Sequence, residues 1–129
     1  MMNETRAGKG HKRIELEDRL ILFAVDILNL AESLPSTRAG NHIGGQITRS
    51  GTAPALIYGE AQSAESRKDF IHKMKIALKE LRETNVALKI IKIKPLVEQP
   101  DSVNPLMKEC HELISIFVAS INTARRNLK

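Results

Sequence analysis

The sequence contains no Trp, and aromatic residues make up only 3% of its 129 positions. Aromatic cages and base-stacking platforms both need several flat rings, so this scarcity argues against either kind of site. Cys110 is the single cysteine, which excludes an internal disulfide and fits the reducing cytosol. We therefore expect a cytoplasmic protein that recognises no partner by aromatic stacking.

A long apolar run is also missing. No stretch approaches the roughly 20 apolar residues of a membrane-spanning helix, and the N-terminus lacks the apolar region of a signal peptide. The composition that is present, 42% hydrophobic and 27% charged residues, is ordinary for a globular domain. The net charge of +5 permits weak attraction to nucleic acid or anionic surfaces. We expect one domain with no role at a membrane.

The chain is organised around the segment from Phe70 to Ile91, which contains neither Gly nor Pro. Its apolar positions alternate by four and three residues, a heptad seam in which Thr84 fills the one gap. These positions are Phe70, Met74, Ala77, Leu81, Leu88 and Ile91. The spacing predicts one helix of about 25 residues, roughly 40 Å long at about 1.5 Å per residue.

Three further segments each show one apolar stripe at helical spacing. They run from about Glu15 to Leu34, from about Asn41 to Ala61 and from about Asn104 to Asn127. Four such helices close most simply as an all-α, antiparallel up-down-up-down four-helix bundle, which we place at residues 14–129. Residues 1–13 are basic and lack apolar periodicity, so we expect a flexible N-terminal tail.

Local signals place the helix ends. Pro35 ends the first helix, and residues 36–40 read as a polar turn. Ser66 and Asp69 resemble a capping box at the start of the third helix. Pro105 suits the first turn of the fourth helix, after a cap at Asn104.

The helix predicted over residues 41–61 has poor intrinsic propensity. Its glycines stand at Gly44, Gly45, Gly51 and Gly59, and each costs about 1 kcal/mol relative to Ala. Pro54 also removes one backbone hydrogen bond. Such a helix persists only if packing overrides propensity, so the small residues predict the close approach of a neighbouring helix.

Apolar residues are more numerous than one four-helix core can bury. Val86, Ile90 and Ile93 lie off the seam of the third helix. The fourth helix is apolar around much of its girth, through Leu113, Ile114, Ile116, Phe117, Val118 and Ile121. This surplus predicts an interface between subunits.

Residues 67–94 carry nine Lys or Arg against three acidic residues. Five of these cations lie opposite the apolar seam and form what we call the basic stripe: Lys68, Lys75, Lys79, Arg82 and Lys89. One interpretation is a solvated helix surface in which Lys79 reaches Glu83. The other is a site for the phosphates of RNA or DNA, with electrostatic affinity and little sequence reading.

No residues combine into a recognisable catalytic or metal site. The nearest match to a di-iron motif is Asp69 with His72, which occurs once and has the wrong acid. Cys110 lies on an apolar stripe and reads as a small core residue. We expect no enzyme activity, no catalytic residue, no metal and no cofactor.

Charged residues also gather at the joint between the second and third helices. They are Arg49, Glu60, Glu65, Arg67 and Asp69. Carboxylates and guanidinium groups in such a cluster can pair as a structural network, and the alternative is a site for an anion or a partner.

The second and third helices carry motifs that resemble a known family. They read Arg-Ser-Gly-Thr over 49–52, Tyr-Gly-Glu-Ala-Gln-Ser-Ala-Glu-Ser over 58–66, Asp-Phe-Ile-His-Lys over 69–73 and Ile-Ala-Leu-Lys-Glu over 76–80. The pattern resembles the bacterial four helix bundle proteins encoded in intervening sequences of 23S rRNA genes. The chain departs from it at Leu56 and Ile57, where the family usually has a small residue and Asn.

The resemblance implies a left-handed bundle that assembles as a homopentamer and has no established enzymatic activity. The family is similar to the accessory protein of diversity-generating retroelements, a basic pentameric bundle that binds nucleic acid and a reverse transcriptase. Two hypotheses follow. The first is an oligomer that binds RNA or DNA through the basic stripe, and the second is a structural or protein-interaction module.

Overall fold

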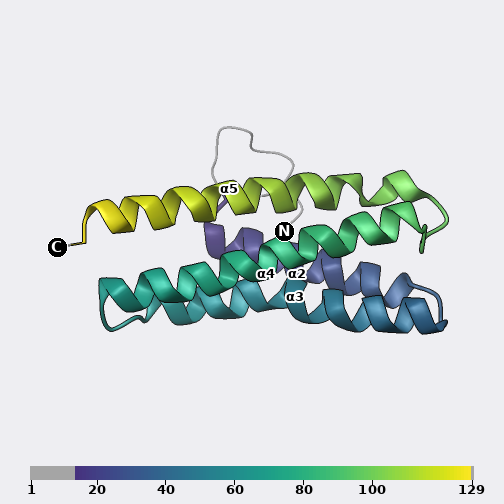
Figure 1. The fold of residues 1–129 in the computed structure, drawn as a ribbon, viewed down its shortest axis with the longest axis horizontal. Coiled ribbons are helices and arrows are strands. Elements are labelled where there is room, and N and C mark those ends of the chain that lie inside the picture. Colours follow the sequence, from purple (N-terminus) through teal and green to yellow (C-terminus); the bar gives the residue numbers. More distant parts are fainter. Residues whose placement is uncertain (1–13, 129) are drawn as a thin grey trace.

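The computed structural model describes residues 14–128, and four long helices with one short 3₁₀ turn account for most of them (Figure 1). The prediction of a flexible tail over residues 1–13 lies outside the described residues. The elements are α2 (Leu16–Ser33), α3 (Arg38–Gln62), α4 (Arg67–Ile93), η1 (Pro100–Val103) and α5 (Asn104–Arg126). Among these described helices, none combines the length and the apolar content of a membrane span.

The helices run up and down in sequence, so each lies antiparallel to the next (Figure 1). In the described range α3 packs against α2 and α4, and α5 packs against α4 and more briefly against α2, whereas α2 and α4 do not meet. This is the predicted antiparallel four-helix bundle, with α2 and α4 on opposite sides. In Figure 1 α4 lies nearest the viewer and α2 lies behind it.

The heptad seam of α4 forms the centre of the core. Met74, Leu81, Leu88 and Ile91 have no exposed surface, and the other helices bury large apolar side chains against them. Those side chains include Phe23 and Ile27 of α2, Ile47 of α3, and Leu113 and Phe117 of α5. Every helix contributes one apolar stripe to one shared core, so the stability of each helix depends on its packing against the others.

Gly51 brings α3 against α2. A Cβ atom at this position would lie 2.6 Å from Ile27 Cγ2, so only glycine leaves room for the buried isoleucine. The prediction of close helix approach is therefore confirmed at Gly51. It is wrong at Gly45 and Gly59, where a Cβ would meet nothing within 4 Å.

The ends of α3 and α5 differ from the prediction. Residue 38 is already helical, because the Thr37 side chain caps α3 by accepting a hydrogen bond from the Gly40 N–H at 3.0 Å. Asn104 is the first residue of α5 and does not cap it. Its Oδ1 instead accepts a hydrogen bond from Lys92 Nζ at 2.8 Å.

The start of α4 agrees with the prediction. The Ser66 hydroxyl accepts a hydrogen bond from the Asp69 N–H at 3.0 Å. After α4 the chain returns through a connection that buries Leu96 and Val103, so this long loop is fastened to the end of the core.

Candidate nucleic-acid interface

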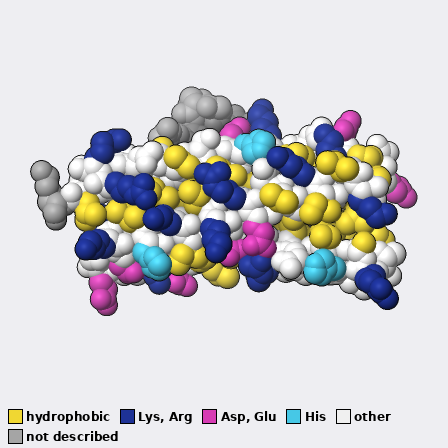
Figure 2. Space-filling view, in the orientation of Figure 1, with side chains coloured by type: hydrophobic (Ala, Val, Ile, Leu, Met, Phe, Trp, Pro, Cys, Tyr) yellow, Lys and Arg dark blue, Asp and Glu magenta, His cyan; other side chains and the backbone are white. Residues whose placement is uncertain are grey.

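All five side chains of the basic stripe are exposed, on the side of α4 that faces away from the buried seam. They extend from the first turn of α4 to its last third, over about 30 Å at about 1.5 Å per residue. Figure 2 shows Lys and Arg side chains spread along this side of the molecule among hydrophobic ones. The helix thus separates one buried apolar side from one exposed basic side.

The carboxylates nearest the middle of the stripe are held by another helix. Arg49 of α3 pairs with Glu80 at 2.9 Å and also with Glu83. The prediction that Lys79 reaches Glu83 is therefore wrong, because Glu83 turns toward α3. The positive charges of Lys79 and Arg82 are left facing water without a carboxylate partner among residues 14–128.

Other cations of α4 are in ion pairs. Lys73 Nζ lies 3.0 Å from a carboxylate oxygen of Glu60, and this contact raises the pKa of Lys73. Lys92 Nζ lies 3.6 Å from a carboxylate oxygen of Asp101. Within the described part of the chain, the stripe consists of α4 cations that have no ion-pair partner, whereas Lys73 and Lys92 lie off it.

The predicted charged network at the α3–α4 joint does not form as expected. Arg49 bonds to Glu80 and Glu83 near the middle of α4, and Glu60 bonds to Lys73. The two α3 residues lie on different turns, so they meet different parts of the antiparallel α4. These ion pairs fasten α3 to α4 and do not gather at one site.

Another set of ion pairs joins α2 to α5. Arg19 donates through Nε and Nη2 to the Glu109 carboxylate at 3.0 and 2.6 Å, and through Nη2 to Glu112 at 3.0 Å. The hydrogen bond with Glu109 raises the pKa of the Arg19 guanidinium. The only cation of α2 is therefore turned toward α5 and away from the outer surface of its own helix.

Apolar side chains interrupt the basic stripe on its C-terminal half. Val86 is 55% exposed and Ile93 is 80% exposed. These residues and Ile90 were predicted to be surplus to the core, and they are. Of the α5 residues in that prediction, Ile114, Ile116 and Val118 are half-buried, so α5 shows a smaller excess than α4.

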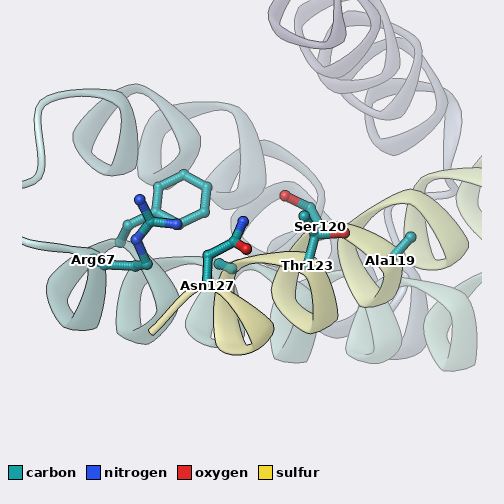
Figure 3. Close-up of a pocket in the computed structure, with 7 residues that line it drawn as sticks. Arg67, Ala119, Ser120, Thr123 and Asn127 are labelled. Carbon is teal, nitrogen blue, oxygen red and sulfur yellow. The ribbon is translucent and has the colours of Figure 1, made fainter. Parts of the chain in front are cut away.

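A groove of about 670 Å³ lies at the end of the bundle where α4 begins and α5 ends (Figure 3). Arg67 lines it from α4, Thr123 lines it from α5, and Asn127 lines it from just beyond the end of α5. Sequence reasoning missed this groove. The feature related to the groove is the difference in helix length. Helix α2 has 18 residues against 27 in α4, and it begins part-way along the bundle (Figure 1).

Cys110 is a core residue, as predicted. Its side chain is fully buried, and Sγ donates to the Leu81 carbonyl at 3.3 Å. Burial raises the pKa of the Cys110 thiol to about 12, so the thiol stays protonated and unreactive at neutral pH. The described residues contain no cluster of three His, Cys, Asp or Glu that could hold a metal ion.

Comparison with known proteins places the chain in a family. The sequence matches the family described as 23S rRNA-intervening sequence protein over residues 12–119. The chain belongs to this family. Among curated proteins, none matches the sequence.

A solved structure of similar sequence has the same fold as this chain. It comes from Bacteroides thetaiotaomicron and is described as a protein of unknown function from the S23 ribosomal protein family. The two sequences are 31% identical, and the structures superpose with a TM-score of 0.77 over 83% of this chain and 98% of that one. The two proteins therefore share the four-helix bundle.

Proposed function

We propose that this 23S rRNA-intervening sequence protein is a non-enzymatic, oligomeric bundle that binds RNA or DNA electrostatically through the basic stripe. The observation that carries the proposal is the difference between two sets of cations. Arg49, Lys73 and Lys92 are in ion pairs, whereas the stripe cations are exposed and have no carboxylate partner within residues 14–128. Unpaired cations along one helix are suited to a polyanion.

The shape of the stripe favours contacts to phosphates over contacts to bases. Its cations follow one straight helix over about 30 Å, while a DNA duplex carries about one charge per 1.7 Å of its axis. The stripe contains no aromatic side chain on which a base could stack. We therefore expect binding that depends on charge and discriminates little between sequences.

We propose self-association, as a homopentamer, as part of the same function. Exposed Val86 and Ile93 on α4 support an assembly, because apolar side chains on an outer surface favour contact with another subunit. A ring of copies would repeat the stripe at each subunit. Modest charge on one chain would then become a large positive field, which speeds the approach of a polyanion.

The experiment that tests the binding site compares two triple variants of equal net charge. The first is Lys68→Gln, Lys75→Gln and Lys79→Gln. It should weaken binding to a single-stranded RNA or a DNA duplex by at least about tenfold at low salt, because it removes more than half of the stripe. Fluorescence anisotropy measures the dissociation constant, and circular dichroism checks that the helices persist.

The matched control is Lys73→Gln, Lys92→Gln and Lys108→Gln. Lys73 and Lys92 are in surface ion pairs, which contribute only about 0–1 kcal/mol each to stability, and Lys108 is exposed on α5, so the bundle should fold and bind almost as before. Equal losses in both variants would mean that only net charge matters. Unchanged binding by the stripe variant would show that the site lies elsewhere.

A protein-interaction module is the second candidate, because Ile93 is the most exposed of the large hydrophobic residues described. Such a module would capture a protein partner in a manner insensitive to salt. Substituting Ile90 or Ile93 with Asp should abolish the capture, while the Gln variants of the stripe should leave it intact.

A further inference from the structure

The outer surface of α2 carries a second apolar row that has no partner in the described structure. Ile21, Val25 and Leu28 are 37%, 46% and 38% exposed. They point away from Phe23 and Ile27, which fill the core. The sequence analysis assigned α2 a single stripe and missed this row, which we call the α2 outer row.

The exposed charged residues of α2 are all acidic. Glu17 and Asp18 are exposed before it, and Glu32 is exposed after it. The one cation of α2, Arg19, is bound to Glu109 and Glu112 on α5. The outer surface of α2 is therefore apolar at its centre and negative at both ends.

The outer surface of α4 has the opposite charge around a similar centre. Val86, Ile90 and Ile93, which we call the α4 outer row, are exposed together. Arg82 and Lys94 are exposed at its two ends, and Lys89 is exposed beside it. Since Arg49 holds Glu83, no free carboxylate of α4 neutralises this region.

The two rows match in spacing as well as in charge. Each has apolar residues at positions i, i+4 and i+7, the arrangement that forms a helix–helix seam, and each is about 10 Å long. We propose that α2 of one copy docks on α4 of the next copy through these rows. This interface rests on the self-association proposed above and identifies the surfaces that produce it.

A parallel arrangement of the two helices pairs both charged ends. Ile21 then meets Val86, and Glu17, four residues before Ile21, meets Arg82, four residues before Val86. At the other end Glu32 approaches Lys94. Because α2 and α4 also run parallel within one copy, successive copies keep one orientation, as a closed ring requires. Oppositely charged residues beside an apolar seam set partner choice and orientation, so the register is specified.

The positions of α2 and α4 in the bundle determine how successive copies can assemble. Since α2 and α4 lie on opposite sides and do not meet, one copy presents its two rows in opposite directions. A head-to-tail contact of this kind generates a ring if the rotation closes, and a filament if it does not. Docking covers the C-terminal half of α4, so Lys68, Lys75 and Lys79 remain open to a polyanion.

Two surface variants test the interface. Val25→Arg places a cation in the α2 outer row, and Ile90→Arg places a cation in the α4 outer row, so the two altered rows repel each other. Light scattering should show that each reduces the assembly to the 14.4 kDa monomer, with circular dichroism unchanged. Leu56→Arg is the control, because Leu56 is 70% exposed on α3 and belongs to neither row.

Mixing the two variants provides the decisive measurement. Each retains one intact row, so an equimolar mixture should form a complex of twice the monomer mass, joined by one α2–α4 contact. An interface of α2 with α2, or of α4 with α4, could not form in this mixture. Absence of the complex would overturn the proposal.

A charge exchange keeps the proposal testable if either variant folds poorly. Glu17→Arg should weaken the assembly, and adding Arg82→Glu in the same chain should restore it. Persistent assembly of Val25→Arg would reject this interface and leave self-association standing. A wild-type chain that is monomeric at every concentration would reject both.

Discussion

At the scale of single residues, Gly51 determines how closely α2 and α3 can approach. A Cβ there would lie 2.6 Å and 2.9 Å from two atoms of the Ile27 side chain, which is fully buried and cannot move aside. The Gly45 position of the same helix is exposed and open. Two glycines in one helix therefore serve different purposes, and only one of them is needed for packing.

We predict opposite outcomes for the same substitution at these two positions. Gly45→Ala should stabilise the protein by about 1 kcal/mol, because Ala is the better helix former. Gly51→Ala gains the same propensity but overpacks the α2–α3 contact at a cost of about 1–3 kcal/mol. Urea unfolding should separate the two variants by that cost, and equal stabilities would contradict the packing described here.

At the scale of elements, two hydroxyl groups link α3 to α4 inside the core. Ser50 Oγ and Thr84 Oγ1 lie 3.0 Å apart, and Thr84 Oγ1 donates to the Glu80 carbonyl at 2.8 Å. Both side chains are fully buried. Thr84 interrupts an otherwise apolar seam, so its partner on α3 fixes which turn of α3 packs beside it.

The pair predicts non-additive mutational effects. Thr84→Val alone leaves the Ser50 hydroxyl buried without this partner and should cost about 1–3 kcal/mol. Adding Ser50→Ala removes the orphaned group, so the double variant should be less destabilised than the sum of the two single variants. Strictly additive losses in urea unfolding would show that the hydroxyls do not interact.

The sequence predicted a helix and its buried side correctly where the apolar residues follow a single periodicity. The α4 seam, the exposure of the basic stripe and the surplus of Val86, Ile90 and Ile93 all follow from residue spacing along a single helix. The α2 outer row was missed because residues 20–25 are apolar without a break, so periodicity there could not say which side packs inward. The register between neighbouring helices could not be predicted either. Arg49 pairs with Glu80 and Glu83 because of the axial position of α3 relative to α4, which the residue pattern of a single helix does not specify.

At the scale of the whole molecule, the bundle separates three kinds of surface. The core buries one stripe from each helix, α2 presents an acidic and apolar outer surface, and α4 presents a basic and apolar one. Each of the long helices α3, α4 and α5 exceeds α2 in length, which leaves the groove beside Arg67 at one end. Because opposite surfaces are complementary, assembly and polyanion binding can use different parts of the same helix.

The central claim is that the basic stripe binds phosphates, and the salt dependence of binding tests it most directly. The three stripe cations outside the proposed α2–α4 contact predict a slope of log K against log salt of about −2 for single-stranded RNA and about −3 for a DNA duplex, or steeper if copies act together. Removing them as Lys68→Gln, Lys75→Gln and Lys79→Gln should reduce the magnitude of that slope by about 2–3. A wild-type slope near zero, or the same slope in the triple variant, would contradict the account.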